Sequence, residues 1–212
     1  MSGGKYPSKT LRVLAILNGI NYGFYSSLMG LLATNGASLQ QGYMWHWDHN
    51  SISLRLSHTN TDFLGWLVDL FTGLGLSFKD KEFIEVLSSR SIKIGSLPSQ
   101  LCFILWLHWN ESTINELPYH FAEYFSIKTL AFWAMRNGHW VGNTFIIVVG
   151  SRQNDFEKTL LMTLIKDKLG FDSHLIRDGK QLAIHNPEDL VFEMKPYFHS
   201  SQMHRLQNNL YH

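Results

Sequence analysis

The sequence is poor in the residues that build several common kinds of site. It has one cysteine, Cys102, which excludes an intramolecular disulfide and a metal site made of several cysteines. Because Cys102 lies in an apolar run over residues 101–109, we expect a buried thiol and not a nucleophile. Charged residues make up only 17% of the chain and the formal net charge is +1, so any surface that attracts a polyanion must be local.

Long hydrophobic runs are also missing. The longest apolar stretches, such as Leu101–Leu107 and Phe145–Val149, are well short of the ~20 residues that a membrane-spanning helix needs, so we expect no membrane span. Residues 1–47 contain no acid and carry Lys5, Lys9 and Arg12, which would suit an organelle transit segment or a basic arm on a polyanion. Hydrophobic residues are plentiful, since they make up 45% of the 212 residues, which is enough for a sizeable core.

A repeat with a spacing of about a hundred residues organises the chain. An apolar helix near residues 28–34 closes in Asn35-Gly36, and a second near residues 128–136 closes in Asn137-Gly138. Strands and a helix are predicted after each closing turn. After the first turn these are strands at Tyr43–Trp47 and Ser51–His58 and a helix with apolar positions from Phe63 to Phe71. The chain is therefore interpreted as two tandem α/β halves.

The second half shows the clearer local signals. The predicted elements are a strand at Thr144–Gly150, a helix from about Asp155 that Gly170 closes, strands at Ser173–Arg177 and Gln181–His185, and a last helix from Pro187 to about Pro196. Asp178-Gly179 between the two later strands is a strong signal for a hairpin turn.

This arrangement resembles the single-chain LAGLIDADG homing endonucleases and the related intron maturases. The resemblance covers residues from about 20 to 206 and includes weaker matches in a consistent order. These matches are residues 59–62 leading into 64–67, the segment from Ser91 to Trp109, Leu117-Pro118 followed by residues 129–133, and the ending at 200–206.

The resemblance implies an α/β (α+β) fold with pseudo-twofold symmetry. Two αββαββα-like halves would form a curved β saddle around two central helices, in a monomer that acts as a pseudo-dimer. The expected divisions are an N-terminal extension over 1–19, a first half over 20–112 and a second half over 113–212. Small residues would let the helices approach closely, with Gly30 and Ala33 in the first and Ala131 and Ala134 in the second at the contact.

The resemblance also places the catalytic centre at the ends of the two helices, where this chain departs from the family. In the family an acid before each terminal glycine reaches a divalent metal, but here Asn35 and Asn137 stand at those positions. An amide lends one neutral oxygen but not the anionic charge that holds Mg²⁺. Arg136 stands where the family commonly has another acid, and a basic residue that the family has before Leu117-Pro118 is missing. We therefore expect no catalytic residues, no metal and no cofactor.

An alternative is that another acid replaces the lost ligands. Asp48, Asp62, Asp155 and Glu157 are the candidates, although Asp62 is typical of a helix start and the others lie in predicted turns.

Residues for nucleic-acid contact are suggested by the strand pattern and by local positive charge. The segment 51–57 alternates, which places serines and Arg55 on one face and aliphatic residues on the other. Hydroxyls beside cations suit phosphates, and an aromatic strand face suits unpaired bases. The predicted nucleic-acid-binding residues are Tyr43, Ser53, Arg55, Ser57, Arg90, Lys93, Arg136 and Arg152.

The predicted function is therefore a LAGLIDADG-fold protein that binds structured RNA without catalysis. The expected RNA is organellar ribosomal RNA, with neighbouring ribosomal proteins as further partners, or a group I intron in the manner of a maturase. The mitochondrion or another organelle follows from the resemblance alone. The alternatives are an active or residual site-specific homing DNA endonuclease and a DNA-binding regulator of the same fold.

Overall fold

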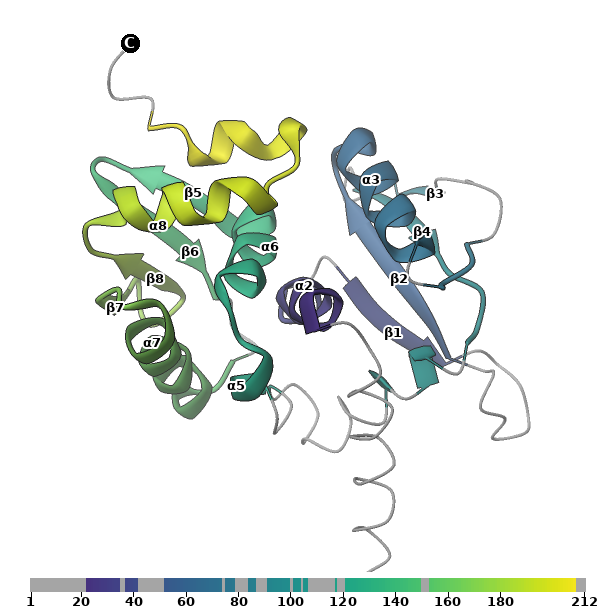
Figure 1. The fold of residues 1–212 in the computed structure, drawn as a ribbon, viewed down its shortest axis with the longest axis horizontal. Helices are drawn as coiled ribbons and strands as arrows, with labels where there is room; N and C mark the ends of the chain where they lie inside the picture. The colour runs from purple at the N-terminus through teal and green to yellow at the C-terminus, as the bar shows by residue number, and fades with distance from the viewer. Residues whose placement is uncertain are drawn as a thin grey trace, which may run out of the picture.

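The computed structural model repeats one order of helices and strands (Figure 1). It describes residues 22–34, 37–41, 52–73, 75–78, 84–86, 91–99, 101–103, 105–106, 117, 121–149 and 153–208. The first half comprises α2 (Tyr22–Leu32), β1 (Ala37–Gln41), β2 (Ile52–His58), α3 (Thr61–Thr72), β3 (Ile84–Val86) and β4 (Ser91–Gly95). The second comprises α5 (Phe121–Tyr124), α6 (Ile127–Asn137), β5 (Gly138–Val141), β6 (Thr144–Val148), α7 (Asp155–Leu169), β7 (Ser173–Ile176), β8 (Gln181–Ile184), α8 (Pro187–Met194), η1 (Lys195–Tyr197) and η2 (Ser200–Leu206).

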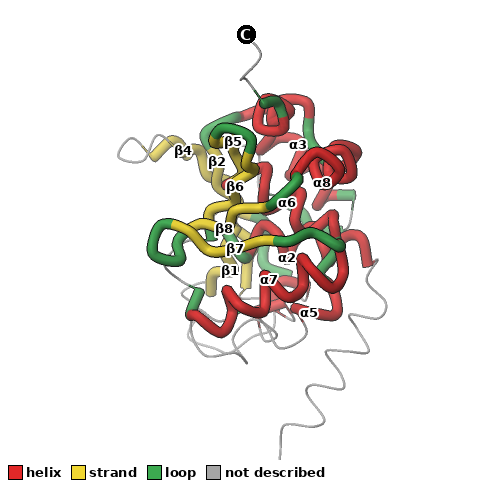
Figure 2. Tube along the Cα trace, turned by 90° about the vertical axis from the view of Figure 1, so that its left-hand side faces the viewer, coloured by secondary structure: helices red, strands yellow, loops and turns green. Residues whose placement is uncertain are grey.

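Among the described residues, each half builds one antiparallel sheet of four strands with the same topology. The strand orders are β1-β2-β4-β3 and β5-β6-β8-β7, which confirms the predicted fold class. Figure 2 shows the labelled strands gathered toward one side of the molecule and the helices toward the other. The sheets therefore share a face that the labelled helices do not cover. Within the described part of the chain, no helix has the length and apolar character that a bilayer crossing requires.

The two repeated helices, α2 and α6, pack directly on each other in the centre of the fold. Gly30 of α2 is the point of closest approach, because a Cβ placed there would overlap the backbone oxygen of Thr129 and lie 2.9 Å from the Cβ of Phe132. Real Cβ atoms do not approach a neighbour so closely, so only glycine fits. The predicted position of Gly30 at the helix contact is confirmed.

Gly138 allows a second close approach between backbone and side chain, and it does not end α6 in a left-handed conformation. Its φ of −86° and ψ of 144° are extended, so α6 passes straight into β5. A Cβ at Gly138 would lie 2.7 Å from the backbone oxygen of Ala134 and 2.9 Å from the ring of Phe145. This strand after the second helix was missed in the sequence, as was β1 after the first helix. The strand predicted at Tyr43–Trp47 lies outside the described residues.

Local signals in the sequence set most of the other helix ends. Asn60 caps α3 by accepting a hydrogen bond from the backbone N–H of Phe63 at 2.8 Å. Asn154 and Glu157 form a reciprocal capping box at the start of α7, and Gly170 ends that helix with a left-handed φ of 81°. The predicted hairpin is also present, since β7 and β8 pair antiparallel across a turn that contains Asp178.

Candidate nucleic-acid interface

The end of α6 is the position where the resemblance places a catalytic carboxylate. The Asn137 side chain is half-buried there, and its Nδ2 donates to the backbone oxygen of Val148 at 3.3 Å. Trp133 Nε1 donates to the same oxygen at 3.1 Å. The amide of Asn137 is therefore turned onto β6 and fastens the helix end to the sheet. Asn35 lies outside the described residues.

Arg136 connects the two halves at the same place. Its Nη1 donates to the backbone oxygen of Ser57 at 2.8 Å, and the side chain is half-buried. Burial lowers the pKa of Arg136 from its ordinary value, and the nearby Arg205 lowers it further. Arg205 in turn donates from Nη1 to the backbone oxygen of Gly138 at 3.0 Å. Two cations thus lie close together and bind backbone carbonyls, with no salt bridge to either among the described residues.

His58 lies near these two cations and is itself uncharged. Its side chain is 3% exposed, and its Nδ1 accepts a hydrogen bond from the backbone N–H of Asn60 at 2.9 Å. Burial is the main reason that the pKa of His58 falls from 6.5 to about 4, and the charges of Arg136 and Arg205 lower it further. The imidazole is therefore neutral at pH 7.

The depressed pKa of His58 predicts a loss of stability in mild acid. As the pH falls from about 6.5 to about 4, the unfolded chain takes up a proton at this histidine while the folded chain resists it. We expect this one group to remove up to about 3 kcal/mol of the free energy of unfolding over that window. Urea unfolding at pH 7.5 and pH 4.5 measures it, with His58→Asn as the comparison because asparagine can still accept the Asn60 N–H. A pH dependence of the same size in both proteins would contradict the assignment.

The uncovered face of the first sheet carries hydroxyls and cations. Along β2 the burial alternates, with Leu54 and Leu56 fully buried, Arg55 exposed and the serines on either side half-exposed. The register pairs Ser57 with Lys93 on β4, which places these two side chains on the same face of the sheet. Four of the predicted binding residues therefore share one surface, which we call the β2–β4 face: Ser53, Arg55, Ser57 and Lys93. Tyr43, Arg90 and Arg152 lie outside the described residues.

The corresponding face of the second sheet has a different chemistry. The register aligns His139, Ile146, Ala183 and His174 across the strands β5, β6, β8 and β7. Ile146 and Ala183 are buried, whereas His174 is exposed and stacks on His185 with ring centroids 4.7 Å apart. These histidines were missed in the sequence because the strand pairing that brings them together is not local. No described position that faces outward on either sheet is a carboxylate.

The acids considered as substitute ligands have other roles in the structure where they are described. Glu157 is 3% exposed, and its carboxylate accepts hydrogen bonds from the backbone N–H groups of Leu117 and Asn154. Asp155 is paired with Lys158 at 3.2 Å. Asp62 lies in the exposed first turn of α3. Asp48 lies outside the described residues, within which no group of three or more histidine, cysteine or acidic side chains is arranged to hold a metal ion.

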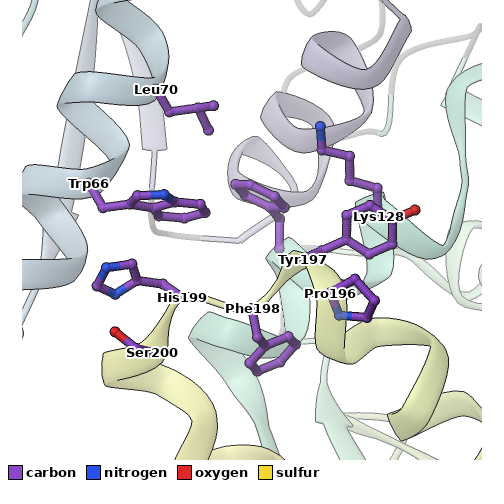
Figure 3. A pocket seen from close by; sticks show the side chains of 9 residues that line it. Trp66, Leu70, Lys128, Pro196, Tyr197, Phe198, His199 and Ser200 are labelled. Carbon is purple, nitrogen blue, oxygen red and sulfur yellow. The ribbon is translucent and has the colours of Figure 1, made fainter.

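An aromatic cavity of about 310 Å³ opens where α3, α6 and the C-terminal segment meet (Figure 3). Trp66 of α3 stacks on Phe132 of α6 at 5.5 Å and on His199 at 5.1 Å. Tyr197 and Lys128 form the opposite side of the cavity in Figure 3. Rings from both halves therefore interlock here, which fastens the C-terminal segment across the junction between the halves.

Two sheets of identical topology, joined by two helices that touch at a glycine, define the class of this protein as a LAGLIDADG-type fold. The model of the LAGLIDADG DNA endonuclease family matches residues 28–189. The chain therefore belongs to this family.

Solved structures of low sequence identity share the fold over most of its length. The homing endonuclease I-WcaI bound to its DNA recognition sequence has a TM-score of 0.69 at 12% identity, covering 90% of this chain and 88% of that one. The N-terminal LAGLIDADG domain of WhiA has a TM-score of 0.52 at 15% identity, covering 86% of each chain. I-DmoI in complex with DNA and Ca has a TM-score of 0.51 at 10% identity, covering 82% of this chain and 89% of that one. Curated proteins offer no match to the sequence.

Proposed function

We propose that this protein binds structured RNA through the faces of its two sheets and does not cut nucleic acid. The observation that carries the proposal is the end of α6, where Asn137 and Arg136 stand in place of the family's acids and both bind backbone carbonyls. Metal-assisted phosphodiester cleavage needs anionic ligands that neutralise and place the metal. A chain that holds RNA needs only cations and donors aimed at phosphates.

The β2–β4 face supports binding. Arg55 is exposed and Lys93 half-exposed, and Ser53 and Ser57 lie on the same surface on either side of Arg55. Positive and hydroxyl-bearing side chains are the usual partners of phosphate and of the ribose 2′-hydroxyl. The ligand we propose is organellar ribosomal RNA, bound alongside ribosomal proteins in a mitochondrion or another organelle, or a group I intron.

A second candidate is a site-specific DNA-binding protein or homing endonuclease. It is favoured by two similar structures, I-WcaI and I-DmoI, both of which are bound to DNA. The same face of the sheets would then lie on a duplex.

Purification from the native source, with sequencing of the nucleic acid that co-purifies, separates these candidates. We expect enrichment of one folded RNA, and purified protein with Mg²⁺ or Mn²⁺ should leave duplex DNA intact. Cleavage of DNA at a discrete site would overturn the proposal of an inactive protein. Enrichment of one DNA duplex over every RNA would overturn the proposal of RNA as the ligand.

A double variant tests which surface binds. We expect Arg55→Ala with Lys93→Ala to lower the slope of log affinity against log salt by about two, since each lost phosphate contact lowers it by roughly one. Lys166→Ala with Lys195→Ala is the matched control, because both lysines are exposed and lie on helices. Binding measured by filter retention across a salt series should be changed by the first pair only. Equal slopes for the two double variants would exclude the β2–β4 face.

A further inference from the structure

A groove of about 400 Å³ lies between the edge strand β5 and η2, at the end of the second sheet. Its lining comes from the β5 hairpin and from the C-terminal segment. The lining residues, which together we call the β5–η2 groove, are Gly138, His139, Trp140, Gly142, His204, Arg205, Gln207 and Asn208. In this set there is a guanidinium, two imidazoles, an indole N–H and two side-chain amides, and no carboxylate. The polar groups of the groove are thus mainly hydrogen-bond donors.

Two of these donors have capacity to spare. The Nε1 of Trp140 is buried and has no hydrogen-bond partner, an arrangement that is costly unless a further group supplies an acceptor. Arg205 uses Nε for Gln202 at 3.0 Å and Nη1 for the oxygen of Gly138 at 3.0 Å, which leaves other N–H groups of its fork for a ligand.

The electrostatic surroundings of the groove are positive. Arg136 lies near Arg205, whose charge lowers the pKa of Arg136 after the larger effect of burial, and the neighbouring His58 is neutral. No described carboxylate within 4.0 Å forms a salt bridge with either arginine. Two partly buried cations without a counter-charge are stabilised when an anion binds nearby.

The groove continues from a proposed binding surface. His139 lines the groove and also pairs with Ile146 in the row that ends at the exposed His174, within which Ile146 and Ala183 are buried. An RNA strand bound along the second sheet would cross the edge strand β5 and enter the groove. The volume is of the order that one nucleotide needs, given that ligand pockets span roughly 300–1,000 Å³.

From this juxtaposition we infer that the β5–η2 groove binds the sugar–phosphate backbone of an RNA strand that leaves the second sheet, with Arg205 contacting a phosphate. Guanidinium and N–H donors without acids are the usual surroundings of a bound phosphodiester. The inference rests on the proposed function for RNA as the ligand, but the phosphate chemistry of the groove would serve DNA as well.

The test places acids at the rim of the groove. His204 and Gln207 are both exposed, so His204→Glu with Gln207→Glu should leave the fold intact. We expect the affinity for the co-purified RNA to fall by roughly tenfold or more at low salt, with a smaller salt slope. The control for added negative charge is Thr159→Glu with Thr163→Glu on the exposed surface of α7, which Figures 1 and 2 place at the opposite end of the second half.

The outcomes separate the groove from the proposed function. An equal loss of affinity in both double variants would contradict RNA binding in the groove, because the repulsion between the added acids and the RNA would then not depend on where the acids lie. If the wild-type protein binds duplex DNA and no RNA, the proposed function is wrong. In that case, weaker DNA binding by the rim variant than by the α7 variant would still support the groove as a phosphate-binding site. Urea unfolding of each variant verifies that the fold is retained, and Arg205→Lys, which keeps the charge but not the fork, should weaken binding less than the rim pair.

Discussion

Gly30→Leu is expected to lower the free energy of unfolding by at least about 3 kcal/mol, at or beyond the upper end of the usual cost of overpacking. The reason is that even a Cβ at Gly30 overlaps the backbone oxygen of Thr129, and Trp133 N lies 3.1 Å away. Backbone atoms of α6 cannot move aside as a flexible side chain can, so the two helices must separate. For a domain of this size the melting temperature should fall by roughly 6–12 °C.

Gly65→Ala is the matched control, because Gly65 also lies within a helix but has nothing within 4 Å of the added Cβ. There we expect a gain of about 0.5–1 kcal/mol from helix propensity. The free energy of unfolding of Gly30→Ala should lie between those of Gly30→Leu and Gly65→Ala. Thermal and urea unfolding of all three proteins measure the series, and a Gly30→Leu protein as stable as wild type would show that α2 and α6 do not touch at this residue.

Glu157→Ala is expected to cost about 2–5 kcal/mol in the free energy of unfolding. Its carboxylate is buried and accepts hydrogen bonds from the backbone N–H groups of Leu117 and Asn154. Alanine leaves the buried N–H of Leu117 and the part-buried N–H of Asn154 without partners, and an unsatisfied buried donor costs about 1–3 kcal/mol. The loss combines two structural roles. One bond closes the capping box at the start of α7, and the other holds the backbone N–H of Leu117.

Glu157→Gln distinguishes hydrogen bonding from packing at this position. Glutamine keeps the side-chain length and one acceptor oxygen, so we expect Glu157→Gln to lower the free energy of unfolding less than Glu157→Ala does. Glu193→Ala on the exposed surface of α8 should change stability by no more than about 0.5 kcal/mol. Urea denaturation supplies the comparison, and Glu157→Ala and Glu193→Ala proteins of equal stability would contradict the proposed role of the buried carboxylate.

Local patterns in the sequence were enough to predict several elements and the repeat. The helix start near Asp155, the glycine that ends α7 and the turn at Asp178-Gly179 were each predicted from residues close together in the sequence, and the structure has all three. The alternation in β2 also indicated its outward face, because residues two apart on a strand always share a side. The strand β5 was missed because its four residues are too few to show a period.

The sequence by itself determined the family, the doubled helix–strand order, the close contact at Gly30 and the replacement of acids by Asn137 and Arg136. Each of these depends on residue types at fixed separations along the chain. Only the tertiary structure decided what those residues touch: Arg136 binds the carbonyl of Ser57 in the other half, 79 positions away, and lies beside Arg205. The β5–η2 groove likewise joins a strand to a C-terminal helix more than sixty residues later. Contacts of that kind arise from the packing of the whole chain, and no local spacing encodes them.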